Sequence, residues 1–525
     1  MSEIHAVALT GLPGSGKSSV GRALAEQLRW SCVDLDDEIA SHAGRPIAVI
    51  FDELGEPAFR DLELAAMRRA LMSEQPVVIA CGGGLIAEEQ ARRELLARAY
   101  VVWLDTSDAV LSDRLGDGSG RPLLREGPEA ALTGLRADRQ RWYSLAHLRV
   151  DASAPVPVTA RRIAVAIGGS VSVPAPGRTY LVAVRPGALL DVSLHVPGGA
   201  GRVAVVTDRR VRPAARRLAA GIRATGRRVT VIGVAGGERL KTWPAAGRLV
   251  RQLSAAGLRR HDCVIALGGG TVGDVTGFAA ATYLRGIAWI NVPTTLLAMV
   301  DSAVGGKTGV NLPRGKNLAG AFWQPRAVVC DPELLMSLST RAYRAALAEI
   351  VKYAMIAEDG LVALLDDRLE RLLSRDAEVI AEAVRRSLAI KAHVVAADER
   401  DTGLRAILNY GHTVGHALEA ATGFGEDLNH GEAIAAGMRV AGKLSVGALG
   451  CPAPHIEWQD EVLRRAGLDR IPRVDPSAVM RSMAADKKAQ DDGVGWVLLE
   501  RRGRPRFGQL VPEEAVCTAL SQVLA

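Results

Sequence analysis

Residues 11–18 read GLPGSGKS and have the spacing of a phosphate-binding loop, directly after an apolar run. Glycines at these positions allow successive backbone N–H groups to surround phosphate oxygens at the start of a helix. Lys17 supplies a positive charge for the β- and γ-phosphates of a nucleoside triphosphate, and the Ser18 hydroxyl suits Mg²⁺. We therefore expect an ATP–Mg²⁺ site made by Gly14, Ser15, Gly16, Lys17 and Ser18.

A second glycine-rich loop, GGGTVGD at residues 268–274, lacks the lysine–serine ending of the first. Such a loop brings backbone close to a pyrophosphate, although it is a weak signal alone. Asp208 ends another apolar run, where a carboxylate accepts from ribose hydroxyls and repels a 2′-phosphate, which favours NAD over NADP. An aspartate that ends a strand at an ordinary turn explains Asp208 equally well. Two unlike cofactor loops in one chain indicate two enzymes.

Four residues have the types and spacing of a catalytic zinc site. His412 and His416 are four residues apart, on one face of an expected helix, and His430 and Glu349 lie elsewhere in the chain. Two imidazoles and one carboxylate suit a Zn²⁺ ion that keeps open positions for substrate oxygens. The pattern is not HExxH, because Thr413 follows the first histidine. Spacing leaves open which two histidines bind the metal.

Cationic and polar side chains in the same half form a candidate pocket for an anionic substrate. Lys307, Lys316 and Asn317 lie in the glycine-rich apolar stretch 298–319, where buried ammonium groups need partners. A solvated face is the ordinary explanation for lysines. The further members of this group are Lys352, Lys391, Arg405, Asn409, Lys487 and Lys488.

Further features of the first half bear on the group that accepts the phosphoryl group. Asp34 and Asp36 stand at alternate positions at the end of an expected strand, where they can serve Mg²⁺ and a hydroxylated acceptor. Helix capping explains Asp36 equally well. The other features are Phe51-x3-Gly55-Glu56-x2-Phe59-Arg60-x2-Glu63, the glycines 82–84, Arg121-Pro122-Leu123-Leu124 behind a glycine-rich segment, and Arg139 four residues before Tyr143.

The elements that must position these groups alternate between strands and helices. Short apolar runs bounded by turns predict buried parallel strands in residues 1–169, with helices between them. Residues 170–178 contain small residues and two prolines, so we expect a linker there. The runs that predict strands are 6–9, 76–80 and 100–104 in the first half, and 203–207, 229–234, 264–267 and 287–292 in the second.

These patterns predict an α/β protein in three parts. An N-terminal P-loop kinase with a parallel sheet is followed by a Rossmann-like NAD-binding α/β subdomain over 179–331. Long patterns rich in Ala, Leu, Glu and Arg then predict an all-helical metal-binding subdomain over 332–525.

The composition favours a globular enzyme that acts on small anionic substrates. The 525 residues are 48% hydrophobic, and the net charge of +7 fits such substrates but equally fits a merely arginine-rich surface. Aromatic residues make up only 4% and no basic block occurs, which argues against nucleic-acid binding. The six scattered cysteines form no CxxC pair and favour a reducing cytosol. We expect no signal peptide and no membrane span, hence a cytoplasmic protein.

Together, the first-half motifs resemble those of shikimate kinase over essentially residues 1–169. The resemblance implies that Asp36 holds ring hydroxyls of shikimate. It implies that Arg60 and Arg139 clamp the shikimate carboxylate, while the backbone at Gly82 and Gly83 borders the substrate.

The same resemblance assigns roles around the nucleotide. Asp34 would position Mg²⁺, and Arg121, on a glycine-rich lid, would close over ATP and stabilise the transferring phosphoryl group. The chain departs from the family at Arg141-Trp142, where Pro-Leu usually precedes the tyrosine.

The second half resembles 3-dehydroquinate synthase over about residues 179–525, through the motifs at 293–302, 305–317, 348–353 and 409–419. That family is a zinc- and NAD-dependent lyase acting on 3-deoxy-arabino-heptulosonate 7-phosphate. The resemblance implies that Glu349, His412 and His430 bind Zn²⁺ or Co²⁺, with His416 a polar active-site residue that can relay protons.

The resemblance also implies cofactor and substrate contacts. Positions that contact NAD in the family are Asp208, Glu238, Lys241, Gly269, Gly270, Asp274, Thr294, Thr295 and Lys316. Positions that contact substrate are Asp301, Lys307, Asn317, Lys352, Lys391, Arg405, Asn409 and Lys488. Of these, we expect Lys307, Lys352, Lys391, Arg405 and Asn409, together with His416, to act in catalysis.

The chemistry of the family explains why these cofactor and substrate contacts are needed. NAD⁺ oxidises the C5 hydroxyl, phosphate leaves by β-elimination, C5 is reduced again, and an aldol step closes the ring, so the cofactor is recycled. Asp401 stands where the family usually has Glu, and Ala303 where Ser is usual. The resemblance further implies a homodimer formed through the synthase part.

The leading hypothesis is a bifunctional enzyme of the shikimate pathway, which supplies aromatic amino acids. The two reactions are not consecutive in that pathway, so direct hand-over of product between the sites is not expected. Another sugar-phosphate cyclase joined to a kinase is an alternative, but Lys391, Asn409, His416 and the Lys487-Lys488 pair favour dehydroquinate formation. A regulatory ATP-binding module without catalysis is a third alternative. It is disfavoured by four intact residues, Lys17, Asp34, Asp36 and Arg60.

Overall fold

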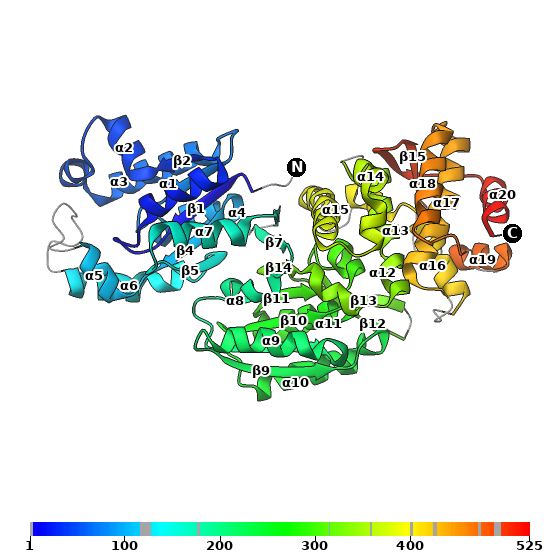
Figure 1. The fold of residues 1–525 in the computed structure, drawn as a ribbon, viewed down its shortest axis with the longest axis horizontal. Coiled ribbons are helices and arrows are strands. Elements are labelled where there is room, and N and C mark those ends of the chain that lie inside the picture. The colour runs from blue at the N-terminus through cyan, green and yellow to red at the C-terminus, as the bar shows by residue number, and fades with distance from the viewer. Residues whose placement is uncertain are drawn as a thin grey trace.

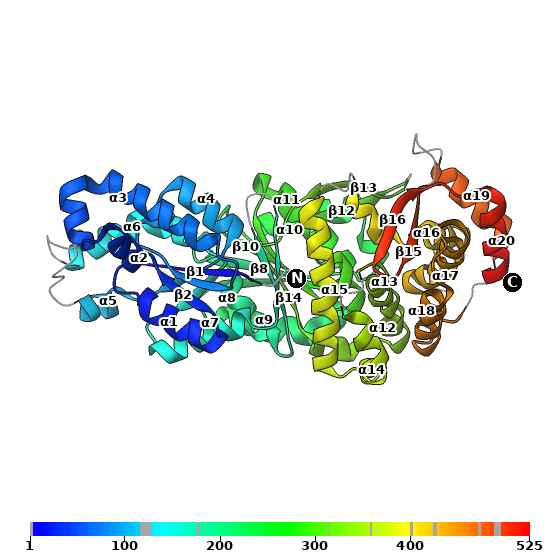
Figure 2. The ribbon, with the colours of Figure 1, turned by 90° about the horizontal axis from the view of Figure 1, so that it is seen from above.

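The computed structural model describes residues 4–115, 128–175, 179–313, 315–357, 360–399, 403–423, 428–470, 474–487 and 495–524. Arg121, Asp401 and Lys488, all singled out above, lie outside these ranges. The kinase part, the NAD-type sheet and the helical part follow one another along the long axis of the molecule in chain order (Figures 1 and 2).

The first part is a parallel five-stranded sheet with the strand order β2-β3-β1-β4-β5. Its central strands are buried along their whole length, because helices cover both faces of the sheet. The strands are β1 (Ala6–Thr10), β2 (Ser31–Asp34), β3 (Val77–Ala80), β4 (Tyr100–Asp105) and β5 (Leu148–Asp151). The helices are α1 (Lys17–Leu28), α2 (Leu35–Ala43), α3 (Ile47–Leu71), α4 (Glu89–Arg98), α5 (Asp108–Leu115), α6 (Pro128–Tyr143) and α7 (Val156–Ile167).

The second part is a seven-stranded sheet with the order β6-β7-β14-β11-β10-β8-β9, parallel except at β6. Its strands are β6 (Ser170–Val173), β7 (Tyr180–Val184), β8 (Arg202–Asp208), β9 (Arg228–Val234), β10 (Cys263–Gly268), β11 (Ala288–Pro293) and β14 (Ala327–Cys330). Its helices are α8 (Val192–His195), α9 (Arg212–Arg223), α10 (Trp243–Ala255) and α11 (Gly270–Thr282). A separate hairpin, β12 (Lys307–Leu312) and β13 (Gly315–Phe322), packs against α11.

The third part is helical, as expected, and adds one hairpin, β15 (Trp496–Arg501) and β16 (Arg504–Gln509). Its helices are α12 (Thr340–Ala345), α13 (Leu347–Ala357), α14 (Leu361–Leu373), α15 (Ala377–Ala397), α16 (His412–Ala421), α17 (His430–Leu449), α18 (Ala453–Arg465), α19 (Pro476–Lys487) and α20 (Glu513–Leu524). Among the helices of the described ranges, none is both long and apolar enough to cross a membrane.

The expected linker is partly wrong, because Ser170–Val173 form strand β6. This strand pairs antiparallel with β7, with Ser170 opposite Ala183 and Val173 opposite Tyr180. The alternation Ser-Val-Ser-Val has the period of a strand, and it buries Val171 and Val173 in a core shared with α15. The prolines that suggested a linker come only after this strand.

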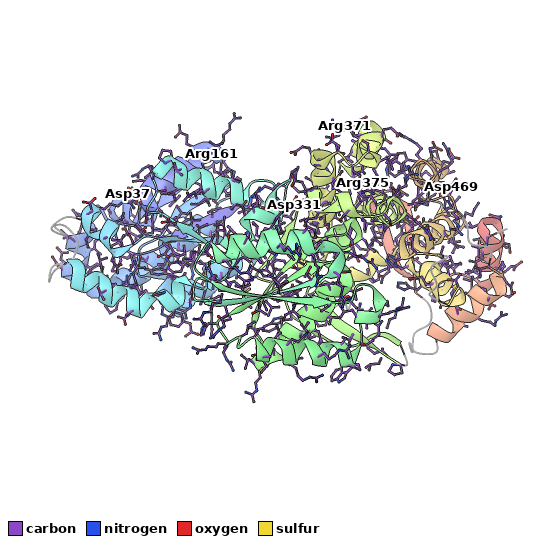
Figure 3. The ribbon with its side chains drawn as sticks, turned by 60° about the horizontal axis from the view of Figure 1, so that its bottom comes forward. Asp37, Arg161, Asp331, Arg371, Arg375 and Asp469 are labelled. Atoms are coloured by element: carbon purple, nitrogen blue, oxygen red, sulfur yellow. The ribbon has the colours of Figure 1, made fainter. Side chains whose placement is uncertain are left out.

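The change from sheet to helical part falls at Asp331, labelled in Figure 3. Its carboxylate accepts hydrogen bonds from the backbone N–H groups of Gly187 (3.1 Å), Leu189 (3.0 Å) and Glu333 (3.0 Å). Asp331 thereby caps the turn that follows it and ties that turn to the loop after β7. The turn near the expected boundary is thus hydrogen-bonded to the sheet part.

Candidate active sites

The phosphate-binding loop lies between β1 and α1, where the carboxyl edge of the sheet meets a helix N-terminus. Gly14 and Gly16 adopt positive φ values of 81° and 88°, which favour glycine. A Cβ atom at Gly11 would lie 2.6 Å from the carbonyl oxygen of Leu104, so the loop packs closely against β4. Lys17 Nζ donates to the carbonyl oxygens of Gly11 (3.0 Å) and Leu12 (3.1 Å), across the loop. The arrangement fits phosphate oxygens held by backbone N–H groups at a helix start.

Asp34, and not Asp36, caps helix α2. The Asp34 carboxylate accepts from the backbone N–H of Asp36 at 3.1 Å. The capping alternative for Asp36 is therefore wrong. The Asp36 carboxylate lies instead beside the glycine segment, with Oδ1 3.7 Å from where a Cβ of Gly82 would stand.

Arg60 is held by two glutamates of its own helix. It forms ion pairs with Glu63 and, at 2.7 Å, with Glu56. Its guanidinium lies against Gly84, where a Cβ atom would come within 2.4 Å of Nη2. Glu63 is 1% exposed, and burial raises its pKa while Arg60 opposes the rise. Sequence reasoning gave Glu63 no role, although its i,i+3 spacing from Arg60 was a usable signal.

Arg139 comes from α6 and reaches the same glycine segment. Its Nη1 is buried and has no hydrogen-bond partner among the described residues. That atom lies 3.6 Å from where a Cβ of Gly83 would stand, and Tyr143 Oη donates to the Gly83 carbonyl at 2.6 Å. Burial raises the pKa of Tyr143 to about 12. An unsatisfied guanidinium donor beside Asp36 and Arg60 fits an anionic ligand in this pocket.

In the second site, Glu349 of α13 meets two histidines from neighbouring helices. Its Oε1 lies 3.6 Å from Nε2 of His412 on α16 and 3.8 Å from Nε2 of His430 on α17. These three residues offer ligand atoms within 4.8 Å of one another. Burial and the charge of Lys352 lower the pKa of His412 well below its ordinary value, which keeps the imidazole neutral for a metal. The donor set fits Zn²⁺ or Co²⁺.

His416 belongs to a second, overlapping group with Glu419 and His430. The ring of His416 is exposed and stands edge-on to His412, with ring centroids 5.3 Å apart. Glu419 Oε2 lies 3.4 Å from Nδ1 of His430, on the ring side opposite Glu349. Lys316 Nζ lies 3.8 Å from Glu419. Glu419 was given no role from sequence, although it lies within the quoted motif.

Buried ammonium groups border the metal cluster. Lys352 is 1% exposed and pairs with Glu349, and Lys391 Nζ lies 2.5 Å from Oδ1 of Asp301. Burial favours the neutral acid at Asp301, but Lys391 and Lys352 hold the pKa of Asp301 well below its usual range. Asp301 and Lys391 therefore form a charged pair within the site.

The NAD-type loop lies at the start of α11, with Gly269 as its N-cap. Lys241 Nζ lies 2.6 Å from Asp274 on that helix; burial raises the pKa of Asp274, and Lys241 opposes the rise. The neighbouring expected contacts follow the carboxyl ends of β8, β10 and β11, which are adjacent at one edge of the sheet. Gly270 lies beside Ser302, and Gly269 lies beside Thr295. The Thr294 N–H donates to the Gly268 carbonyl oxygen at 2.9 Å, and Asp208 lies against Gly236. This edge has the form of a dinucleotide-binding crevice.

The hairpin β12–β13 carries further expected contacts toward this edge. Asn311 donates to Glu238 Oε1 at 2.6 Å and accepts from the Asn317 backbone N–H at 2.9 Å. Asn311 appears in the quoted motif but received no role from sequence. Lys307 begins the same hairpin and is exposed.

Arg405 and Asn409 stand on the short helix η9 (Leu404–Asn409), just before α16. Arg405 is buried and donates to the Glu399 carbonyl at 2.8 Å, while a Cβ atom at Gly305 would come within 2.4 Å of its Nη2. Asn409 is exposed. Of the expected second-half substrate contacts, only Lys488 lies outside the described residues.

The fold and the two clusters define a P-loop kinase joined to a metal- and dinucleotide-type α/β enzyme with a helical second part. Family models agree: residues 13–167 match shikimate kinase, 231–345 match the 3-dehydroquinate synthase N-terminal model, and 346–489 match its C-terminal model. The 3-dehydroquinate synthase of Bordetella pertussis is 42% identical over 354 residues, which is 67% of this chain and 98% of the relative. That of a Synechococcus strain is 41% identical over 366 residues, 67% and 99% of the two chains.

A solved structure points the same way. A 2-deoxy-scyllo-inosose synthase, solved with carbaglucose-6-phosphate, NAD⁺ and Co²⁺, is 28% identical and has a TM-score of 0.61, covering 68% of this chain and 100% of its own.

The chain belongs to the 3-dehydroquinate synthase family and carries a shikimate kinase domain at its N-terminal end. It is a bifunctional enzyme with two activities of the shikimate pathway, shikimate kinase and 3-dehydroquinate synthase.

Proposed function

We propose that the kinase half phosphorylates the 3-hydroxyl of shikimate with ATP–Mg²⁺, and that Arg139 and Arg60 hold the shikimate carboxylate. The orphaned Nη1 of Arg139 carries this assignment, because a buried guanidinium donor is costly unless a ligand pairs with it. Asp36, beside the same glycine segment, orients ring hydroxyls. Lys17 and Ser18 serve the nucleotide phosphates and Mg²⁺, Asp34 supports the ion, and Arg121 is the proposed lid residue.

Arg139→Lys tests the carboxylate clamp. Lysine retains the charge but loses the planar fork, so we expect the KM for shikimate to rise about tenfold or more, with little change in the KM for ATP. A KM for shikimate that stays at the wild-type value would refute the clamp.

We further propose that Glu349, His412 and His430 hold Zn²⁺ or Co²⁺ and that the crevice at Gly269 and Asp274 holds NAD⁺. The neutral His412 and the buried Glu349 carboxylate support this, as does the related inosose synthase solved with NAD⁺ and Co²⁺. When bound, the metal polarises a substrate hydroxyl and the nicotinamide accepts and returns a hydride.

The chain's own residues then have distinct tasks in converting 3-deoxy-arabino-heptulosonate 7-phosphate to 3-dehydroquinate and phosphate. Lys391, paired with Asp301, and Lys352, paired with Glu349, are proposed to present ammonium groups to substrate oxygens. Arg405, Asn409 and Lys488 are proposed for the phosphate that departs, and His416 for a proton relay. Lys316, tied to Glu419, is proposed to lie between the cofactor and the metal side.

Metal content and activity together test the second assignment. Wild-type protein loaded with one equivalent of Zn²⁺ or Co²⁺ should convert the heptulosonate phosphate to dehydroquinate, and Glu349→Gln should bind far less metal. Full metal binding by Glu349→Gln would remove Glu349 from the ligand set. We also propose a homodimer formed through the synthase part and a cytoplasmic location, which sedimentation and cell fractionation can test.

A further inference from the structure

Helix α6 of the kinase half ends against an arginine of the synthase half. Arg326, in the segment before β14, donates through Nη2 to the carbonyl oxygens of Ala146 (2.6 Å) and Ser144 (3.4 Å), just after α6 ends. The backbone N–H of Arg326 donates to Trp289 in β11 at 2.8 Å. The backbone of Arg326 is therefore anchored in the seven-stranded sheet, while its guanidinium binds the other half of the chain.

A second kinase helix, α4, also ends at a residue of the synthase half. Thr179, just before β7, donates through its backbone N–H to Leu96 (2.9 Å) and through Oγ1 to Ala97 (2.5 Å), both in the last turn of α4. The last carbonyls of a helix have no partner within the helix, and a cation at that end also suits the helix dipole. Thr179 thus supplies helix-ending hydrogen bonds to α4, while Arg326 binds the turn that follows α6.

The surroundings of these contacts are apolar and closely packed. Leu181 and Ala183 of β7 share one buried cluster with Leu148 and Ile163 of the kinase half. Gly198 lies so close to Trp103 of β4 that a Cβ atom there would come within 2.4 Å of the indole ring. Removing the guanidinium from such a place leaves carbonyl oxygens without partners.

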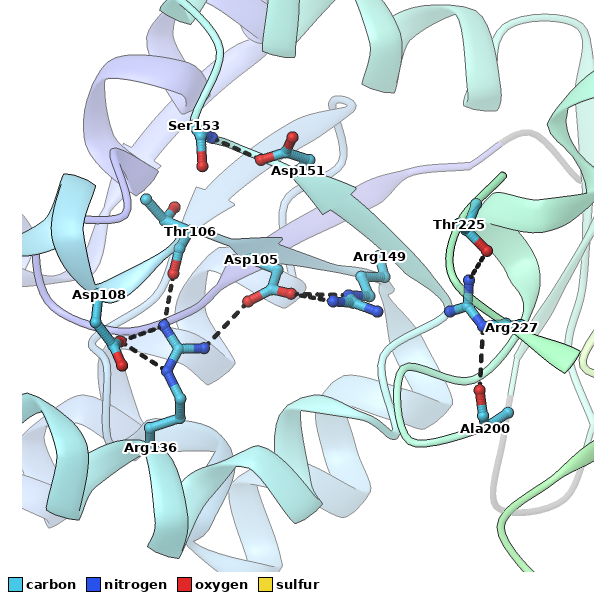
Figure 4. A network of polar contacts seen from close by, with 10 residues as sticks. All are labelled: Asp105, Thr106, Asp108, Arg136, Arg149, Asp151, Ser153, Ala200, Thr225 and Arg227. Carbon is cyan, nitrogen blue, oxygen red and sulfur yellow. Dashed lines mark hydrogen bonds and ion pairs between the residues drawn. The ribbon is translucent and has the colours of Figure 1, made fainter. Parts of the chain in front are cut away.

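Helix α6 also carries shikimate-pocket residues, so its position matters to the kinase. Arg136, in the middle of α6, binds Asp108 (2.7 Å) and Asp105 (3.3 Å) within the kinase half, and Figure 4 shows this network together with Arg149. The C-terminal end, with Arg139 and Tyr143, comes directly before the carbonyls that Arg326 holds. The end of α6 is held from both halves: Tyr143 binds Gly83 within the kinase half, and Arg326 of the synthase half binds the turn that follows.

We propose that Arg326 is a positioning residue for the kinase reaction, which fixes the end of α6 and thereby aims Arg139 at the shikimate carboxylate. This inference rests on the proposed role of Arg139. It assigns the synthase sheet a part in kinase substrate affinity, with no transfer of product between the sites.

Arg326→Leu in the full-length chain is the test, since leucine keeps apolar bulk and removes the donors. We expect the KM for shikimate to rise about tenfold, with the KM for ATP and the synthase turnover within about twofold of wild type. Arg326→Lys, which retains one cationic donor, should give an intermediate KM. The matched control is Arg375→Leu: Arg375 (Figure 3) also donates to carbonyl oxygens, of Leu335 (2.9 Å) and Leu338 (2.7 Å), but within the synthase half.

The possible results distinguish the positioning role of Arg326 from the clamp role of Arg139. An unchanged KM for shikimate in Arg326→Leu, alongside a raised KM in Arg139→Lys, overturns the positioning role and leaves the clamp standing. Unchanged values in both variants count against the clamp itself. A parallel loss of both activities in Arg326→Leu shows a purely structural contact and also overturns the proposal. Where Arg326→Leu does not accumulate as folded protein, the same comparison with Arg326→Lys decides.

Discussion

Oε1 of Glu349 lies between two imidazoles, 3.6 Å from Nε2 of His412 and 3.8 Å from Nε2 of His430. The glutamate is fully buried and comes from a different helix than either histidine. Three helices thus converge on one point with a carboxylate whose charge must be balanced. Lys352 also pairs with this carboxylate, and the two imidazoles complete a set of ligand atoms that suits a metal ion.

Glu419→Gln tests the support behind His430. The carboxylate at 3.4 Å from Nδ1 orients the ring and raises its basicity as a ligand, so we expect metal affinity to fall about 10- to 100-fold. Competition with a chromophoric chelator measures this. Glu382→Gln is the control, because Glu382 pairs with Arg368 and Arg386 away from the cluster. Equal affinity in Glu419→Gln and wild type would show that Glu419 does not support the ligand.

Gly84→Ala tests the close approach of Arg60 to the glycine segment. The added Cβ would come within 2.4 Å of Nη2, so the guanidinium must move and the KM for shikimate should rise about tenfold or more. Gly134→Ala is the matched control, since a Cβ there meets nothing within 4 Å. A wild-type KM for shikimate in Gly84→Ala would place the substrate away from Arg60.

His195 predicts a pH dependence of stability. Burial, with Arg326 and Arg185 nearby, lowers the pKa of His195 from 6.5 to about 4. As pH falls below 6.5, His195 therefore binds a proton in the unfolded chain but stays neutral in the folded chain until about pH 4. The stabilisation that is present above pH 6.5 is lost progressively as pH falls toward 4. The shift corresponds to about 3 kcal/mol in total.

His195→Gln should flatten this part of the profile. Thermal midpoints of wild type and His195→Gln, measured from pH 7 to 4.5, should converge on acidification, whereas His261→Gln, at an exposed position, should run parallel to wild type. A constant gap between His195→Gln and wild type across this range would show that His195 does not titrate as described.

Local patterns predicted the cofactor loops and most strands because their signals are contained within a few residues. The GLPGSGKS loop, the strand ending at Asp208 and the i,i+4 pair His412 and His416 are of this kind. The resemblance chose Glu349, His412 and His430 from four candidates, and the structure brings these three together. Spacing alone had left that choice open.

Contacts between distant residues could not be predicted from local patterns. Nothing in the sequence near Arg326 indicates that its partners are the carbonyls of Ser144 and Ala146. Strand β6 was not predicted, because its alternating pattern covers only four residues and prolines follow it directly. Pairing with β7 stabilises this short strand. The capping role of Asp34 required the backbone geometry at the start of α2.

The central claim is that one chain holds two separate catalytic sites, and both reactions measured on His412→Ala test it most directly. Conversion of the heptulosonate phosphate to dehydroquinate should fall to background with loss of bound metal, because a ligand is removed. ATP-dependent phosphorylation of shikimate by the same preparation should stay within about twofold of wild type. Loss of both reactions together in folded protein, or full synthase activity without the His412 imidazole, would contradict the account.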